Sequence, residues 1–256
     1  MTTAKPTIII IPGSFSTLRG YEAVISGLES YGYPVHGIEL ETVGVRKKAP
    51  GLYDDAAKVA ALASQLAEEG KDVVLVPHSY GGLVASEAAK GLAKSVREKE
   101  GKKGGIVRIV FITAVLGLEG QSSADIMADS EVKMDYIGME GEYMTLDPAG
   151  CAPVVFNDLS PEEGLSWASQ MPNHSAISFA QKLTYGAYKD IPVSYLFCER
   201  DKCITPKKQT QIIAAMESQM GGRTVGRHSV PADHAITVSQ PKTTVAVIRK
   251  ALGDTV

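Results

Sequence analysis

Short apolar runs alternate along this chain with longer segments in which apolar residues recur every three or four positions. The short runs are rich in β-branched residues, and several are apolar at nearly every position, as strands buried on both faces are. We predict strands at Thr7–Ile11, Pro34–Leu40, Asp72–Val76, Ile106–Thr113, Pro192–Cys198 and Arg223–Val230. We predict helices at Tyr21–Ser30, Tyr53–Glu69, Gly82–Lys99, Pro206–Met220 and Pro241–Leu252. This alternation favours an α/β fold with a mostly parallel sheet and helices on both faces.

The alternation breaks down between Ala114 and Tyr185. This stretch contains the one tryptophan, Trp167, and five of the eight methionines. The five are Met127, Met134, Met139, Met144 and Met171. Long insertions beside a site are usually functional, and methionine fits irregular pockets, although it is also ordinary core filler. We therefore predict that residues 115–185 form a lid within a single domain of residues 1–256.

Composition and charge exclude several classes of protein. The 256 residues are 44% hydrophobic and 21% charged, which is typical of one large globular domain. A net charge of -3 without a basic stripe argues against nucleic acid as a partner. The apolar run from Ile8 stops at Pro12, too short for a signal peptide or a membrane span, so a cytoplasmic protein is expected. The charged run Arg97–Lys103 has mixed signs and is expected to be a solvated helix end and loop.

The three cysteines, Cys151, Cys198 and Cys203, are too few and too uneven for a disulfide framework. No nearby Cys or His cluster completes a zinc site. We expect three reduced thiols and no bound metal.

The most informative motif is Pro77-His78-Ser79-Tyr80-Gly81-Gly82, which lies between a predicted strand and a stretch of small residues. A strand, a sharp turn and a helix with serine at the apex expose the hydroxyl and aim the positive end of the helix at it. Ser79 is therefore predicted to be a nucleophile. Pro77 stands where the usual G-x-S-x-G pattern has its first glycine.

A serine needs a base that a third group orients, and in this architecture the partners follow in the order Ser, Asp or Glu, His. Asp201 comes after the strand that ends at Cys198, and His234 comes after the last predicted strand. Asp201 is preferred to Glu199, because Glu199 adjoins the strand and is expected to point into a neighbouring element. A solvated salt bridge at the turn is the alternative role for Asp201.

The other four histidines are assigned less specific places. His36 and His228 lie in or beside strands and are interpreted as structural or surface residues. The ring of His78 is expected to point away from the cleft, since adjacent strand residues face opposite sides. His174 lies in the predicted lid, where it either contacts substrate or sits at the surface.

Acyl chemistry also needs donors for the oxyanion. The backbone N–H of Tyr80, which follows the nucleophile, is one candidate. The other is the N–H of Ser14 or Phe15 in the turn after the first strand, unless this is an ordinary Pro-Gly turn. Phe15, Trp167 and His174 are candidate residues of the substrate pocket.

Four motifs together resemble the α/β-hydrolase superfamily, in particular the small esterases grouped with plant methylesterases and hydroxynitrile lyases and their fungal relatives. The motifs are Ile11-Pro12-Gly13-Ser14, Pro77-His78-Ser79-Tyr80-Gly81-Gly82, Tyr195-Leu196-Phe197-Cys198-Glu199-Arg200-Asp201-Lys202 and Ala232-Asp233-His234. The resemblance implies Ser79 as nucleophile, Asp201 as acid, His234 as base, and Ser14 and Tyr80 as oxyanion donors.

The chain departs from that pattern at three positions. Pro12 replaces the histidine usual in the first turn, which alters the wall of the cleft. Pro77 replaces the first glycine of the elbow, where a strand end tolerates its fixed φ. Ala235 stands where the lyase branch has a lysine, which argues against cyanohydrin cleavage.

The predicted function is hydrolysis of a small or medium apolar ester or lactone by a serine esterase, with no metal or organic cofactor. The expected partner is a small-molecule substrate, not nucleic acid or membrane, and the oligomeric state is not predicted. One alternative is C–C cleavage, decarboxylation or cyclisation of a polyketide-like metabolite on the same scaffold. A more distant alternative is a ligand receptor, because fold does not determine function.

Overall fold

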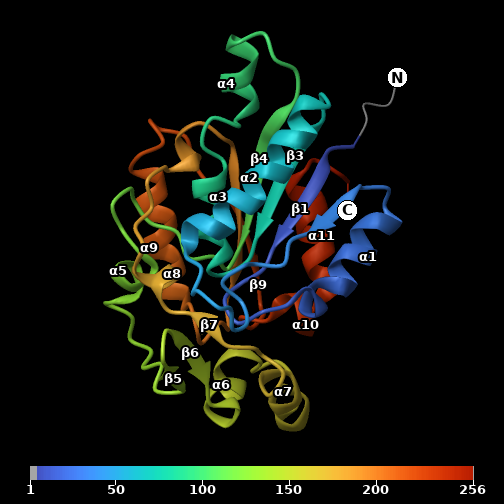
Figure 1. Ribbon diagram of the computed structural model, residues 1–256. Helices are drawn as coiled ribbons and strands as arrows, with labels where there is room; N and C mark the ends of the chain where they lie inside the picture. Colours follow the sequence, from blue (N-terminus) through green and yellow to red (C-terminus); the bar gives the residue numbers. More distant parts are fainter. Residues whose placement is uncertain (1–4, 256) are drawn as a thin grey trace.

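A six-stranded parallel sheet forms the centre of the computed structural model, which describes residues 5–255 (Figure 1). The strand order is β2-β1-β3-β4-β8-β9, and every neighbouring pair is parallel. The strands are β1 (Thr7–Ile11), β2 (Val35–Gly37), β3 (Asp72–Pro77), β4 (Gly105–Ile112), β8 (Val193–Cys198) and β9 (Gly226–Val230). The prediction of an α/β fold with a mostly parallel sheet is confirmed.

Helices cover both faces of this sheet because alternate strand residues point to opposite sides. Ile8 and Ile10 of β1 pack in one apolar cluster with α1 (Glu22–Ser30) and α11 (Pro241–Ala251). Ile9 and Ile11 pack in the other cluster. Its helices are α2 (Leu52–Glu68), α3 (Gly81–Ala88) and α9 (Pro206–Glu217). Short helices η1 (Leu18–Tyr21), α4 (Lys94–Lys99) and α10 (Ile236–Ser239) complete this part of the chain. Within residues 5–255, no helix is both long and apolar enough to cross a membrane.

Several predicted elements differ from the observed ones. The helix predicted at Gly82–Lys99 is two helices, α3 and α4, because the chain turns at Gly91 (φ 74°) and Ala93 then pairs with Ile106 of β4. The edge strands β2 and β9 are shorter than predicted, and both have exposed positions, so they are not buried on two sides. Arg97 is not solvated: its side chain is buried against the carbonyl of Gly104 and pairs with Glu68.

Most of residues 115–185 forms a layer at the end of the sheet where the strands finish (Figure 1), while Leu116, Ile126 and Leu183 of this segment pack in the same cluster as Ile9 and Ile11. Its elements are α5 (Ser123–Met127), β5 (Ile137–Glu140), β6 (Tyr143–Leu146), α6 (Pro148–Val155), α7 (Pro161–Ala168), β7 (His174–Ser175) and α8 (Ile177–Ala180), followed by η2 (Ala187–Lys189). Strands β5, β6 and β7 form a small antiparallel sheet, which the sequence pattern did not predict. Backbone hydrogen bonds from Ser175 N to Thr42 O (2.8 Å) and from Gly44 N to Asn173 O (2.7 Å) fasten this layer to the loop after β2.

The strand order places the loops that carry the candidate residues. The chain moves from β1 outward to β2 and then back to β3 on the other side of β1. The carboxyl ends of β1 and β3 therefore meet at the point where the order reverses, which is where open α/β sheets bind ligands. The turn with Ser14 follows β1 and the turn with Ser79 follows β3.

Candidate active site

Ser79 occupies a strained turn between β3 and α3. Its φ is 52°, a region that residues other than glycine rarely adopt. The end of β4 supports the turn, because Ser79 N donates to Ile112 O (3.1 Å) and Val115 N donates to Ser79 O (2.9 Å). A Cβ at Gly81 would lie 2.6 Å from the carbonyl oxygen of Pro12, so only glycine lets α3 start this close to the end of β1. Pro77 is the last residue of β3, which removes it from the turn itself.

The three residues predicted to act together lie in contact. Ser79 Oγ is 3.0 Å from His234 Nε2, and His234 Nδ1 is 2.8 Å from Asp201 Oδ2. The carboxylate accepts from Nδ1–H, so the neutral imidazole presents Nε2 as the acceptor for the serine hydroxyl. All three side chains are buried.

The Asp201 carboxylate is held by four donors. Oδ1 accepts from the backbone amides of Cys203 (2.7 Å) and Ile204 (2.8 Å). Oδ2 accepts from Thr113 Oγ1 (2.5 Å) as well as from His234. The reading of Asp201 as a solvated salt-bridge residue is therefore wrong. Thr113 follows β4 directly and was missed because threonine at a strand end carries no specific signal.

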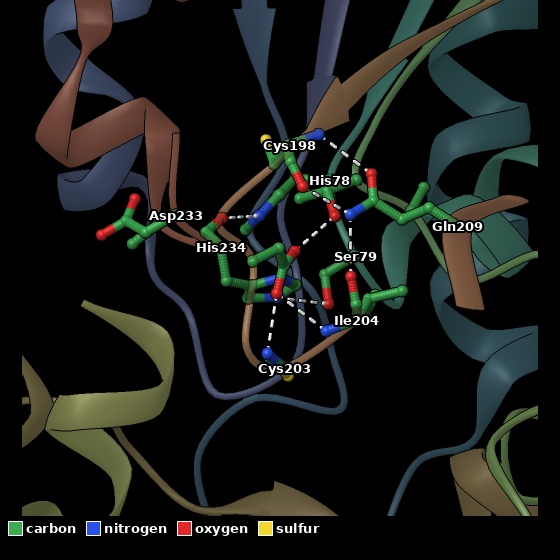
Figure 2. A network of polar contacts seen from close by, with 12 residues as sticks. His78, Ser79, Cys198, Cys203, Ile204, Gln209, Asp233 and His234 are labelled. Atoms are coloured by element: carbon green, nitrogen blue, oxygen red, sulfur yellow. Dashed lines mark hydrogen bonds and ion pairs between the residues drawn. The ribbon is translucent and has the colours of Figure 1, made fainter. Parts of the chain in front are cut away.

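Neighbouring loops hold Asp201 and His234 at a fixed separation. Arg200 N donates to Ala232 O (3.0 Å), which joins the two loops. Gln209 of α9 accepts from Cys198 N and donates to the carbonyls of Cys198 and Ile204, so one side chain binds both the end of β8 and the loop that contains Asp201 (Figure 2).

Glu199 is exposed to solvent, so the expectation that it points into a neighbouring element is wrong.

His78 does not point away from the site. Its Nε2–H donates to the backbone carbonyl of His234 (2.9 Å), and its Nδ1 accepts from Tyr21 OH (2.7 Å), which in turn accepts from Gly13 N (2.9 Å). Burial lowers the pKa of His78 to about 3, which keeps this ring neutral. Strand alternation failed here because His78 already lies beyond the last residue of β3.

The two candidate oxyanion amides are on the turns after β1 and β3. Neither Ser14 N nor Tyr80 N donates a hydrogen bond to any residue in the described part of the chain. Phe15, next to Ser14, also has a positive φ (57°), and its own amide donates to His174 Nδ1 (3.4 Å). Of the two alternatives in the first turn, Ser14 is thus the residue with the free amide.

A buried polar chain lies behind these turns. His174 is fully buried: its Nδ1 accepts from Phe15 N and its Nε2–H donates to Ser178 Oγ (3.0 Å). Burial lowers the pKa of His174 to about 3. The ring of Tyr80 packs edge-on against His174 (5.0 Å), and Tyr80 OH donates to Asp55 Oδ2 (3.2 Å). Burial raises the pKa of Asp55 to about 6. Sequence reasoning missed Asp55, whose position in α2 gives no sign of this contact.

A cavity of about 420 Å³ opens onto Ser79 and His234. Phe15 and Trp167 line it, as predicted, whereas His174 lies behind Phe15 and Tyr80, neither on the wall nor at the surface. Much of the wall is apolar and comes from the 115–185 segment: Met127, Met134, Tyr136, Ile137, Met144, Leu146, Cys151, Val155, Phe156, Trp167 and Met171. Met139, the remaining methionine of that segment, is exposed.

The three cysteines are free thiols in the structure. Cys151 and Cys203 line the cavity, while Cys198 is buried in β8. Burial raises the pKa of the Cys151 thiol to about 12, which keeps it protonated and a poor nucleophile. Across residues 5–255, His, Cys, Asp and Glu side chains form no group of three that is arranged to hold a metal ion.

Comparison with known proteins agrees with this architecture. A sequence model of the Alpha/beta hydrolase family matches residues 8–247. The chain belongs to the alpha/beta hydrolase family. Within that family, a probable hydrolase from Phoma sp. is 32% identical over 97% of this chain and 99% of its own length. An alpha/beta hydrolase from Aspergillus novofumigatus is 26% identical over 98% of each chain.

The fold of this alpha/beta hydrolase is also seen in solved structures. A pyrethroid hydrolase from Sphingobium faniae superimposes with a TM-score of 0.74, at 20% identity over 96% of both chains. The resemblance inferred from the four motifs is thus confirmed at the level of the family and the fold.

Proposed function

We propose that this protein is a serine esterase that cleaves a small or medium apolar ester or lactone through an acyl-enzyme. Ser79 Oγ attacks the carbonyl carbon, and His234 Nε2 takes the hydroxyl proton and returns it to the leaving alcohol. Asp201 holds the imidazole in the tautomer that makes this possible. Water then attacks the acyl-enzyme, with His234 as general base, and releases the acid.

The observation that carries the proposal is the pair of contacts on His234, 3.0 Å to Ser79 Oγ and 2.8 Å to Asp201 Oδ2. A nucleophile within hydrogen-bond reach of a base that a third group orients is the arrangement that acyl transfer requires. The free amides of Ser14 and Tyr80 supply candidate donors for the oxyanion, each worth about 10²–10³ in rate.

The cavity supports an apolar substrate. A volume of about 420 Å³ suits a small or medium ligand, and the wall contributed by residues 115–185 is mostly apolar. We propose that this segment acts as the lid of the site. The fungal relatives, which are named as hydrolases, support the reaction class.

The test is labelling and turnover with p-nitrophenyl esters. Ser79→Ala should lower kcat by about 10⁶-fold, because loss of the nucleophile removes the covalent route. A fluorophosphonate probe should add its mass to the peptide that contains Ser79, and the label should disappear in Ser79→Ala. Ser123→Ala is the matched control, since Ser123 also lines the cavity and makes no hydrogen bond to a histidine within residues 5–255.

Two outcomes would contradict the proposal. Wild-type turnover in Ser79→Ala would show that the serine is not the nucleophile. Product formation from a non-ester substrate in Ser79→Ala would instead indicate general-base chemistry by His234, as in the C–C cleavage alternative.

A further inference from the structure

The charged side chains on the wall of the cavity are of one sign. Among the described residues that line it there is no aspartate or glutamate, and Arg19 is the one arginine or lysine. The remaining polar groups of the wall are hydroxyls, amides, thiols, imidazoles and the indole N–H of Trp167. An anionic group that entered this cavity would therefore meet one permanent positive charge and no carboxylate.

Arg19 is available to a ligand. It lies in η1, just after the turn that carries Ser14, and its side chain makes no ion pair or hydrogen bond within residues 5–255. The guanidinium carbon lies 4.9 Å from the centre of the Trp167 ring, which comes from α7 on the opposite layer. Stacking on an aromatic face orients a guanidinium and leaves its N–H edges free for a planar anion.

We propose that Arg19 is a carboxylate-binding subsite, so that the substrate is an apolar ester or lactone with a carboxylate remote from the scissile carbonyl. This inference rests on the proposed function of Ser79. The reacting carbonyl lies at Ser79, the apolar body lies along the methionines and aromatic rings of the 115–185 segment, and the carboxylate lies at the rim on Arg19. Bidentate pairing of guanidinium with carboxylate would fix the orientation of the substrate.

The size of the effect follows from exposure. Arg19 is exposed, so water partly screens the pair between its guanidinium and the substrate carboxylate. We expect the pair to raise kcat/KM by a factor of about three to five, which corresponds to the upper range for exposed ion pairs. Screening also makes the preference depend on ionic strength, because the Debye length falls from about 10 Å at 0.1 M to about 3 Å at 1 M.

The experiment compares monomethyl adipate and monomethyl suberate with their carboxamide counterparts, which have the same shape and no charge. The measured quantity is the ratio of kcat/KM for each acid to that for its amide. We expect a ratio of about three to five in the wild-type protein, a ratio near one in Arg19→Gln and an intermediate ratio in Arg19→Lys. The ratio in the wild-type protein should fall toward one in 1 M NaCl.

Arg227→Gln is the matched control. Arg227 also stacks on an aromatic ring, with its guanidinium carbon 3.6 Å from the centre of the Phe197 ring, but it does not line the cavity. This variant should keep the wild-type ratio. Binding of each acid and amide to Ser79→Ala and to the double variant Ser79→Ala/Arg19→Gln, measured by calorimetry, gives the same comparison without turnover.

The outcomes separate this inference from the proposed function. The subsite proposal would be wrong if wild type and Arg19→Gln had the same acid-to-amide ratio, that is, if the substitution lowered kcat/KM equally for acid and amide. Arg19 would then only join η1 to α7. Absence of Ser79-dependent hydrolysis of any ester would overturn the proposed function. In that case, a carboxylate preference in the binding experiment that disappears with Arg19→Gln would still support the subsite.

Discussion

Two walls of the same cavity are held in place by different interactions. The polar wall consists of the turns after β1, β3, β8 and β9 and includes Ser14, Ser79 and His234, with Asp201 behind His234. The side chains of Ser79, His234 and Asp201 are hydrogen-bonded to one another, and the backbone hydrogen bond from Arg200 N to Ala232 O joins the turns after β8 and β9. The apolar wall comes from residues 115–185 and is formed by side chains that pack without such partners. The positions of the polar side chains thus depend on backbone hydrogen bonds, whereas the shape of the apolar wall depends on side-chain packing.

Substitution of Asp201 should give the largest effect, because it acts on the polar wall. Asp201→Asn keeps the size of the side chain but favours the wrong imidazole tautomer, and we expect kcat to fall by about 10⁴-fold with little change in KM. Glu199→Gln, an exposed carboxylate two residues away, should stay within about twofold of wild type, since surface substitutions away from a site have small effects. Steady-state kinetics with one p-nitrophenyl ester measures both. A larger loss of kcat in Glu199→Gln than in Asp201→Asn would show that Asp201 is not the acid that orients His234.

Two helical glycines test whether the walls differ in rigidity. At Gly81 a Cβ would lie 2.6 Å from Pro12 O and 2.7 Å from Ile11 O, both backbone atoms that cannot move aside. Gly81→Ala should lower the free energy of unfolding by about 3 kcal/mol. At Gly164 in α7 the nearest atom would be Phe156 Cβ at 3.4 Å, an ordinary contact.

Gly164→Ala should therefore be neutral or raise the free energy of unfolding by up to about 1 kcal/mol, because alanine is the better helix former. Urea denaturation of the two variants gives the comparison directly. Similar losses in both variants would mean that the 115–185 layer is as tightly constrained as the elbow.

The same contrast explains which parts could be predicted from the sequence. Strand β1 was predictable because its apolar run is visible in a single sequence. The order Ser79, Asp201, His234 was predictable because the loops after parallel strands meet at one edge of the sheet. The small sheet of β5, β6 and β7 was not predictable, because its strands are short and mix exposed with buried positions.

The errors near the site have two different causes. His78 was assigned to the wrong side because strand alternation was extended past the end of β3. Thr113 and Asp55 were missed because each acts through a contact between residues more than 20 positions apart, to Asp201 and to Tyr80 respectively. Partners at such separations follow from packing of elements and leave no periodic signal.

Asp55 and His174, which contact Tyr80 from two different parts of the chain, give an effect that depends on pH. Asp55 belongs to α2 and His174 to the 115–185 segment, and both contact the ring or hydroxyl of Tyr80. The pKa of Asp55 is raised to about 6, so its contribution to stability is present at low pH and is lost as pH rises toward 6. The pKa of His174 is lowered to about 3, so its contribution is present above pH 6.5 and is lost as pH falls.

Between pH 4 and 6 these contributions have opposite slopes, each of about 1.4 kcal/mol per pH unit at most. Asp55→Asn removes the term that opposes acid destabilisation, so the free energy of unfolding should fall more steeply with acidification than in wild type. His174→Gln removes a term that drives it, so the fall should be shallower. Urea denaturation at pH 4.5, 5.0, 5.5 and 7.0 measures the slopes, and any pH-independent cost of either substitution cancels. Parallel slopes in all three proteins would mean that water reaches Asp55 and His174 and is not excluded from the surroundings of Tyr80.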